Sequence, residues 1–367
     1  MRFLKIMLPL FFILLLVGCG FKDIDKRFFV VSIGIDKPEN DNFKYNVLLK
    51  LAIPEAEPKM GAKKFILISE EANSITEAVR IMKSRVDKEL DFGHAKTIVL
   101  GEELFEKDIK ETMDWFVRRR DIQNVAWVTL GSPTAKAVLE LKPDSERLPS
   151  NALLLAFGDQ GTETPYITSV FLFKFIRDLN ESGINPVLPI VEMGKEKLFM
   201  INRLVILEEG KEKLRLNKDE TKTFNILDKG YDKTDILVDE EDEKFLISVQ
   251  SLSSNFKVDV KNQDEPSLQI NIKLSGIVEE SQNMIDLKTL NRYEKLVSKA
   301  STKRVKDLIL KFQEEKVDPL GFGLRYRATH SGEESAKYKK WLELYPKLQI
   351  NVNVEAKIEG TGIITSN

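Results

Sequence analysis

Strand-like and helix-like segments alternate along the first half of the chain, and this order constrains the fold more than any other feature. The strand-like segments are rich in β-branched and aromatic residues, and they lie at 27–36, 44–53, 65–68, 94–101 and 124–130. Helical patterns follow at 74–90, at 108–117 and from residue 132. Such an order predicts a mixed sheet with helices packed on its faces.

The first two strands should pair with each other directly. Only the short polar stretch that includes Lys37–Asn40 separates them. A connection of this length favours antiparallel pairing, because parallel strands need a much longer crossover. We therefore expect the two strands to form an antiparallel edge of the sheet.

Two helices have recognisable start signals. Ser74 and Glu77 match a capping box, in which a hydroxyl and a carboxylate each accept from a free backbone N–H. The apolar face of that helix consists of Ile75, Ala78, Val79, Met82 and Val86. Ser132 with Pro133 predicts another helix start, with Ser132 as the N-cap and Pro133 at the first position, where its missing N–H costs nothing.

The pattern changes after residue 141. We expect a helix over 164–181, an extended segment over 186–191, and strands at 199–207 and 245–252. The charged stretch between the last two includes the acidic run Asp239–Glu243. Calcium loops space their oxygens at alternate positions around a glycine. This run has consecutive acidic residues and no glycine, so we interpret it as a solvated turn and not as a calcium site.

The C-terminal part has the pattern of an α+β unit with an antiparallel sheet packed on helices. Apolar and polar residues alternate at 268–274 and again at 348–358. A long helix is predicted over 286–315, with a polar patch at 298–303 where it could bend or break. A shorter helix is predicted over 335–345, with Tyr338, Trp341, Leu342 and Tyr345 facing inward.

Length and composition are those of a folded protein with two or three domains. The chain has 367 residues, of which 42% are hydrophobic and 31% charged, so it can bury a core. We place a mixed α/β domain at 19–193, a strand-rich middle domain at 194–263 and an α+β domain at 264–367. The fold class is thus α+β. Basic and acidic residues are interspersed and the net charge is −2, which argues against nucleic acid as a partner.

The N-terminal segment has the layout of an export signal. Arg2 and Lys5 precede an apolar run at 6–17 that is too short to span a bilayer. The run ends in Leu16-Val17-Gly18-Cys19, which resembles the lipobox of bacterial lipoproteins and contains the only cysteine. We predict a signal peptide over 1–18 and lipidation of Cys19, as an N-palmitoyl and S-diacylglycerol cysteine.

Two acyl chains would anchor the mature protein to the outer face of the cytoplasmic membrane. The alternative is an ordinary secretory signal with an incidental cysteine. A single cysteine also excludes a disulfide within the chain.

Few residues are candidates for chemistry. The only histidines, His94 and His330, lack a second His or Cys at the spacing of a zinc site, and a structural or exposed role is favoured for His94. Gly321-Phe322-Gly323 lacks the third glycine of a nucleotide-binding loop. The run Arg118–Arg120 could contact anionic lipid, but the charged last turn of a helix is favoured. We predict no catalytic residue, cofactor or metal, and hence no enzyme activity.

An ordered set of motifs resembles the Ger(x)C family of spore germination lipoproteins. The set comprises the lipobox at Cys19, Val31–Asp36, His94-Ala95-Lys96, Arg118–Asp121, Asp318–Gly323, Trp341 and Glu359–Gly362. It covers nearly the whole chain. Two departures are Gly20-Phe21 after Cys19, where Trp-Asp is common in the family, and the divergent middle region.

The resemblance implies three mixed α/β domains and a role as the C subunit of a spore germinant receptor. Such a subunit would lie at the inner spore membrane beside two integral membrane subunits, of the A and B types. It would be required for the response to small nutrients, with no known catalytic activity. Whether this subunit itself binds a nutrient stays open.

Two other classes of function are alternatives to this one. A solute-binding lipoprotein of a transporter would need two similar lobes around a hinge cleft, and the C-terminal third does not repeat the first. A surface enzyme would need a constellation of catalytic residues that the spacing does not provide.

Overall fold

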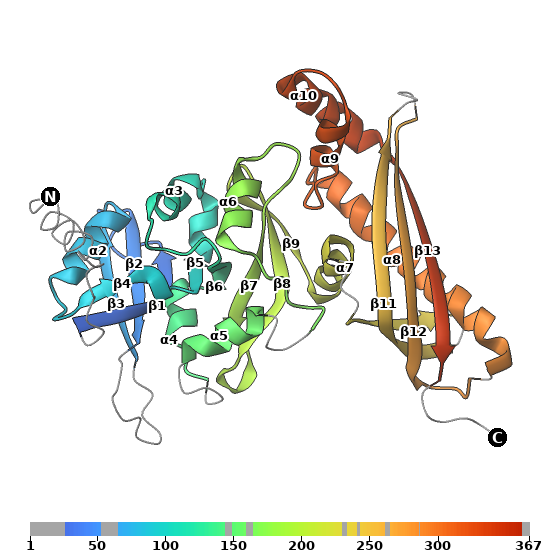
Figure 1. Ribbon diagram of the computed structural model, residues 1–367, viewed down its shortest axis with the longest axis horizontal. Coiled ribbons are helices and arrows are strands. Elements are labelled where there is room, and N and C mark those ends of the chain that lie inside the picture. The colour runs from blue at the N-terminus through green and yellow to red at the C-terminus, as the bar shows by residue number, and fades with distance from the viewer. Residues whose placement is uncertain are drawn as a thin grey trace, which may run out of the picture.

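The molecule is built on two β-sheets, one formed by the N-terminal part of the chain and the other by the C-terminal part (Figure 1). The computed structural model describes residues 26–52, 65–143, 149–158, 164–229, 233–240, 243–260, 265–285 and 287–361. Within these residues, no helix combines the length and the apolar character needed to cross a membrane. The predicted fold class, α+β with mixed α/β units in which sheets pack on helices, is confirmed.

The first sheet has nine strands in the order β3-β2-β1-β5-β6-β7-β8-β9, and β4 also pairs with β1. Their bounds are β1 Arg27–Asp36, β2 Tyr45–Ala52, β3 Phe65–Ala72, β4 Glu89–Asp91, β5 Thr97–Gly101, β6 Trp127–Ser132, β7 Val187–Met193, β8 Phe199–Glu208 and β9 Lys211–Leu216. The central strands β1, β5, β6 and β7 run parallel. The strands on either side of them pair antiparallel.

The antiparallel pairing predicted for the first two strands is confirmed, with Gly34 opposite Leu48. The predicted position at the edge is wrong for both strands, because β5 pairs with β1 on its other side and β3 pairs with β2. The edge strand is β3. A buried run such as Ile33–Asp36 suits the interior of a sheet that is covered on both faces.

Helices cover both faces of this sheet. One face packs against α2 (Ile75–Lys83), α3 (Lys110–Arg118) and α6 (Leu172–Asn180). The other packs against α4 (Ala135–Glu140) and α5 (Pro149–Phe157). Gly34 permits the close approach of α4, since a Cβ there would lie 2.7 Å from Leu139 Cδ1. A glycine in the motif Val31–Asp36 is thus required by packing.

Three helix boundaries differ from the predictions because backbone groups pair elsewhere. The helix predicted over 74–90 ends at Lys83, and residues 89–91 instead pair with β1. Ser132 is not an N-cap: it is the last residue of β6, and the cap of α4 is Thr134, whose hydroxyl accepts from Ala137 N–H at 3.0 Å. The helix predicted over 164–181 begins only at Leu172, because Val170 C=O accepts from Val128 N–H at the start of β6.

The second sheet has four strands in the order β10-β11-β12-β13. Their bounds are β10 Asp235–Glu240, β11 Glu243–Asp259, β12 Ser267–Ser281 and β13 Gln349–Gly360. The predicted apolar face is confirmed, since Leu268, Ile270, Ile272 and Leu274 are all buried. The prediction of a wholly antiparallel sheet is wrong. β13 pairs parallel with β12, because the helices between them bring the chain back to the starting end of β12.

Four helices accompany this sheet: α7 (Lys218–Lys229), α8 (Leu290–Glu314), α9 (Phe322–Thr329) and α10 (Glu334–Leu344). α8 lies diagonally along the sheet (Figure 1) and continues unbroken through the polar patch at 298–303. Ala300 and Ser301 within that patch are buried. In α10, Trp341 faces inward as predicted, but Leu342 is 53% exposed, so its inward assignment is wrong.

Residues 194–263 are shared between the two sheets. β8 and β9 complete the first sheet, whereas β10 and β11 begin the second. α7 lies between them in the chain. The division into domains at 193 and 263 stays a prediction.

Candidate functional site

Several residues singled out in the sequence lie apart in the structure. Cys19 and the signal segment 1–18 lie outside the described residues. The His94 ring packs on Phe29, with 4.5 Å between ring centroids, and the side chain is largely exposed. His330 stacks on Tyr326 at 4.2 Å, and its Nδ1 lies 2.9 Å from the Tyr326 carbonyl oxygen. The two histidines therefore act as packing groups in different parts of the molecule.

The arginine run at the end of α3 is partly used within the fold. Arg118 forms an ion pair with Asp114, with 2.6 Å between Nε and Oδ2. Arg119 pairs with Asp121 and lies 4.5 Å from the centroid of the Phe92 ring. Arg120 is exposed. This is the geometry of a charged helix end, as favoured from the sequence.

The acidic run connects β10 to β11, and residues 241 and 242 lie outside the described part of it. Its other members pair with cations. Glu240 contacts Lys299 at 2.8 Å, and Asp239 contacts Lys244 at 3.3 Å. Elsewhere in the described ranges, no group of three or more His, Cys, Asp or Glu side chains could hold a metal ion.

The segment Asp318–Gly323 connects the two parts of the molecule. It follows α8 and lies against residues 181–186, which lead into β7 of the first sheet. Asp318 N–H donates to the side-chain oxygen of Asn185 at 2.7 Å, and Asn185 N–H donates to the Asp318 carbonyl at 2.9 Å. Leu324 N–H donates to the Gly183 carbonyl at 2.8 Å. We call this contact, between 181–186 and 318–327, the joint.

The buried side chain of Asp318 holds the start of α9 in place on its side of the joint. Its two carboxylate oxygens accept from Phe322 N–H at 3.0 Å and Gly323 N–H at 2.7 Å, at the start of α9. Gly321 precedes them in the left-handed conformation, with φ of 73°. Burial raises the pKa of Asp318 to about 7, against the opposing effect of the backbone donors.

The other side of the joint also depends on close backbone approach. Gly183 has φ of +88°, and a Cβ there would lie 2.7 Å from the carbonyl carbon of Gly323. Arg327 on α9 contacts Glu181 and the Ser182 carbonyl, and pairs with Glu334 at 2.6 Å. In the sequence, 318–323 stood out only as one of the ordered motifs, and no signal marked residues 181–186 as its contact surface.

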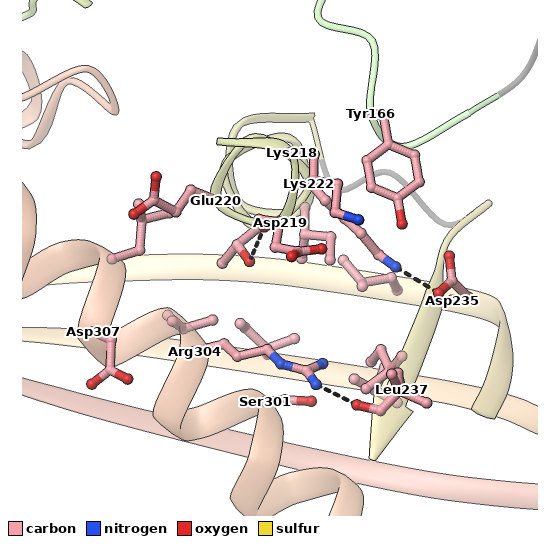
Figure 2. Close-up of a pocket in the computed structure, with 18 of the residues that line it drawn as sticks. Tyr166, Lys218, Asp219, Glu220, Lys222, Asp235, Leu237, Ser301, Arg304 and Asp307 are labelled. Atoms are coloured by element: carbon pink, nitrogen blue, oxygen red, sulfur yellow. Dashed lines mark hydrogen bonds and ion pairs between the residues drawn. The ribbon is translucent and has the colours of Figure 1, made fainter. Parts of the chain in front are cut away.

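A cavity of ≈ 580 Å³ lies between α7, α8 and the second sheet (Figure 2). Its apolar floor comes from all three elements and comprises Ile226, Leu252, Ile272, Leu274, Val305 and Leu308. Known small-molecule sites have volumes of roughly 300–1,000 Å³ and a mostly apolar lining with a few polar groups. The cavity thus has the size and lining of a binding site.

Polar groups gather around this floor. Lys222 of α7 pairs with Asp235 of β10 at 2.6 Å and lies 5.2 Å from the Tyr166 ring centroid. Arg304 of α8 donates to the carbonyl of Leu237 (Figure 2). The cavity was not predicted from the sequence, because α7 was not recognised as a helix.

One polar residue of the cavity has no partner. Ser301 of α8 is only 8% exposed, and its Oγ lies within hydrogen-bonding distance of no group in the described part of the chain. A sequence signal existed for it. Ser301 stands between Val297 and Val305 in the apolar stripe of the helix, where a hydrophobic residue is expected.

Comparison with known protein families identifies the chain. Residues 20–193 match the model described as the spore germination protein N-terminal domain, and residues 202–362 match the C-terminal model described as spore germination B3/GerAC like. The chain belongs to the GerAC-like family of spore germination proteins. The resemblance inferred from the lipobox and the ordered motifs is therefore confirmed as a family assignment.

Two relatives of this GerAC-like protein span nearly its whole length. It is 24% identical to YfkR of Bacillus subtilis (strain 168), a protein named for spore germination, over 98% of this chain and 97% of that one. It is 23% identical to spore germination protein KC of the same organism, over 97% and 95%. The crystal structure of the GerBC protein matches with a TM-score of 0.60 and 19% identity, over 90% of this chain and 98% of that one. That last likeness establishes a shared fold.

Proposed function

We propose that this GerAC-like protein is the lipid-anchored C subunit of a spore germinant receptor. In this proposal it is a structural and signalling component that acts with integral membrane subunits of the A and B types. The observation that carries the proposal is the match of both spore germination models, which together take in most of the chain.

The sequence Leu16-Val17-Gly18-Cys19 supports the lipid anchor. Cleavage ahead of Cys19 would leave its sulfur to carry a diacylglycerol and its amino group to carry a palmitoyl chain. Two chains hold a protein stably on a bilayer, whereas one gives only reversible binding. The protein would then lie on the outer face of the inner spore membrane.

A structural role, without catalysis, fits the way in which the candidate residues are used. Both histidines pack on aromatic rings, and the described acidic and basic runs form ion pairs with neighbours. The alternative function, a solute-binding lipoprotein of a transporter, requires two similar lobes. The two sheets differ in strand number and order, which does not support it.

Replacing Cys19 tests the proposal in spores. Cys19→Ala should move the protein from the membrane fraction to the soluble fraction and slow nutrient-triggered germination at least tenfold, with sporulation unchanged. Lys22→Ala, a nearby change that spares the lipidated residue, should behave as wild type. Membrane retention with normal germination in Cys19→Ala spores would contradict the proposal.

A second measurement addresses the partners. The wild-type protein, captured from detergent-solubilised spore membranes, should bring with it two integral membrane proteins in fixed proportion. Recovery of the protein without either of them would argue against a receptor complex.

A further inference from the structure

In the described part of the chain, four buried side-chain polar atoms have no hydrogen-bond partner, and among them the hydroxyl of Ser301 is the one that lines the cavity. It is buried, it lines the cavity between α7, α8 and the second sheet, and no described group bonds to it. A buried polar group without a partner costs roughly 1–3 kcal/mol. A ligand atom that bonds to this hydroxyl would remove that penalty.

Arg304 stands one helical turn beyond Ser301 on the same face of α8, and Figure 2 shows both side chains at the same wall of the cavity. The guanidinium uses one of its donors for the Leu237 carbonyl, and in the described ranges no carboxylate pairs with it. An arginine has five N–H donors in a planar fork that matches a carboxylate. Ser301 and Arg304 therefore offer adjacent donors for one anionic head group.

The rest of the cavity suits an aliphatic chain. Its floor is formed by aliphatic side chains, including Leu252, Leu274 and Val305, and no aromatic ring lies among the floor residues that α7, α8 and the sheet contribute. We propose that this cavity binds a small aliphatic carboxylate of about six to ten carbons, an estimate that follows from a site of this size. The hydrocarbon chain of this ligand lies on the apolar floor, and its carboxylate lies between Ser301 and Arg304.

Other charged side chains that line the cavity affect its affinity for a carboxylate. Asp219 and Asp307 also line it, and neither forms an ion pair with a described cation. Both disfavour an anion, whereas Lys218 at the same rim favours it. Removal of the Asp219 charge should therefore strengthen carboxylate binding, by about two- to threefold for a partly exposed site.

The test is calorimetric titration of the full chain, held in phosphatidylcholine nanodiscs, with empty nanodiscs as the reference. The probes share a six-carbon chain: hexanoate, hexan-1-ol and hexylammonium. We expect 1:1 binding of hexanoate and at least tenfold weaker binding of hexylammonium. Arg304→Gln should weaken hexanoate at least tenfold and leave hexan-1-ol unchanged, which shows that the cavity is intact in the variant.

Two further variants complete the experiment. Lys306→Gln removes the same charge from an exposed position of α8 outside the cavity and should bind hexanoate as wild type does. Leu252→Trp should fill the cavity and abolish binding of both hexanoate and hexan-1-ol while the protein stays folded. Equal binding of hexanoate and hexylammonium, or undiminished hexanoate binding by folded Arg304→Gln, would overturn the proposal.

Discussion

Asn185 and Asp318 lie 133 positions apart in the chain and exchange two hydrogen bonds across the joint. The Asn185 side chain supplies the acceptor for Asp318 N–H at 2.7 Å. Asn185→Ala removes this acceptor and also the side-chain N–H that donates to the Leu207 carbonyl at 2.9 Å, and it leaves the Asp318 N–H without its acceptor in a partly buried place. We expect the free energy of unfolding to fall by about 1–2 kcal/mol, as measured by denaturant titration.

Asn180 provides the matched control for that measurement. Its side chain is exposed, and among the described residues it bonds within its own helix, to the Ile176 carbonyl at 2.8 Å. Asn180→Ala should change the free energy of unfolding by less than about 0.5 kcal/mol. Equal losses in both variants would mean that Asn185 does not stabilise the joint.

The buried carboxyl of Asp318 should make stability depend on pH. Its pKa in the folded protein is raised from 3.8 to about 7, so between these values the folded state holds a proton that the unfolded chain has lost. The free energy of unfolding should therefore fall as pH rises from about 4 to about 7, and this group should add no further change above pH 7.

Asp318→Asn isolates this effect, because the amide does not titrate. The variant is expected to be less stable overall, since an amide nitrogen cannot accept from Phe322 or Gly323 N–H. Its free energy of unfolding should nevertheless not fall between pH 5 and 7, whereas that of the wild type does. Parallel pH profiles of the two proteins would refute the titration of Asp318 in this range.

Gly183 should not tolerate a side chain. Its positive φ is unfavourable for other residues, and an added Cβ would meet the Gly323 backbone at 2.7 Å. Gly183→Ala should lower the free energy of unfolding by about 1–3 kcal/mol, as strain at such positions does. Gly360→Ala is the control, because a Cβ at Gly360 meets nothing within 4 Å. Thermal unfolding measures this difference: the melting temperature of Gly183→Ala should fall, and that of Gly360→Ala should stay close to wild type.

Trp341 and Leu342 are adjacent in α10 but differ in burial. Trp341 is 1% exposed and lies between the rings of Tyr326 and Tyr345, at 5.5 and 5.1 Å between ring centroids. Trp341→Ala should cost about 3–5 kcal/mol, the range for large buried aromatic residues. Leu342→Ala should change stability by less than about 0.5 kcal/mol. A large loss in Leu342→Ala would indicate that this side chain is covered by a partner.

Local patterns predicted the elements whose type is marked within a few residues of sequence. β1 has the predicted bounds because it is rich in β-branched and aromatic residues, and β12 has the predicted buried face because its apolar residues alternate with polar ones. The cap at Ser74 formed as predicted, since its hydroxyl accepts from Glu77 N–H at 3.1 Å. These features depend on residues a few positions apart.

Most of the failures involve distant partners. Residues 89–91 read as the end of a helix but pair with β1, and residue 170 read as helical but bonds to Val128. The direction of β13 depends on where three helices return the chain. The joint and the cavity each combine segments more than 80 residues apart, as in the pairing of Lys311 with Glu220. No spacing rule within one segment reports such contacts.

The continuity of α8 has a mechanical consequence. The helix contains 25 residues, so at 1.5 Å per residue it is a rod of about 37 Å. One end adjoins the joint, and the other lies near the distant tip of the second sheet. A rotation of about 10° at the joint would displace that tip by roughly 6 Å, from the rod length alone. An unbroken helix packed on the sheet would therefore act as a lever arm if the joint rearranged, and a small rotation beside the first sheet would become a larger displacement at the far end.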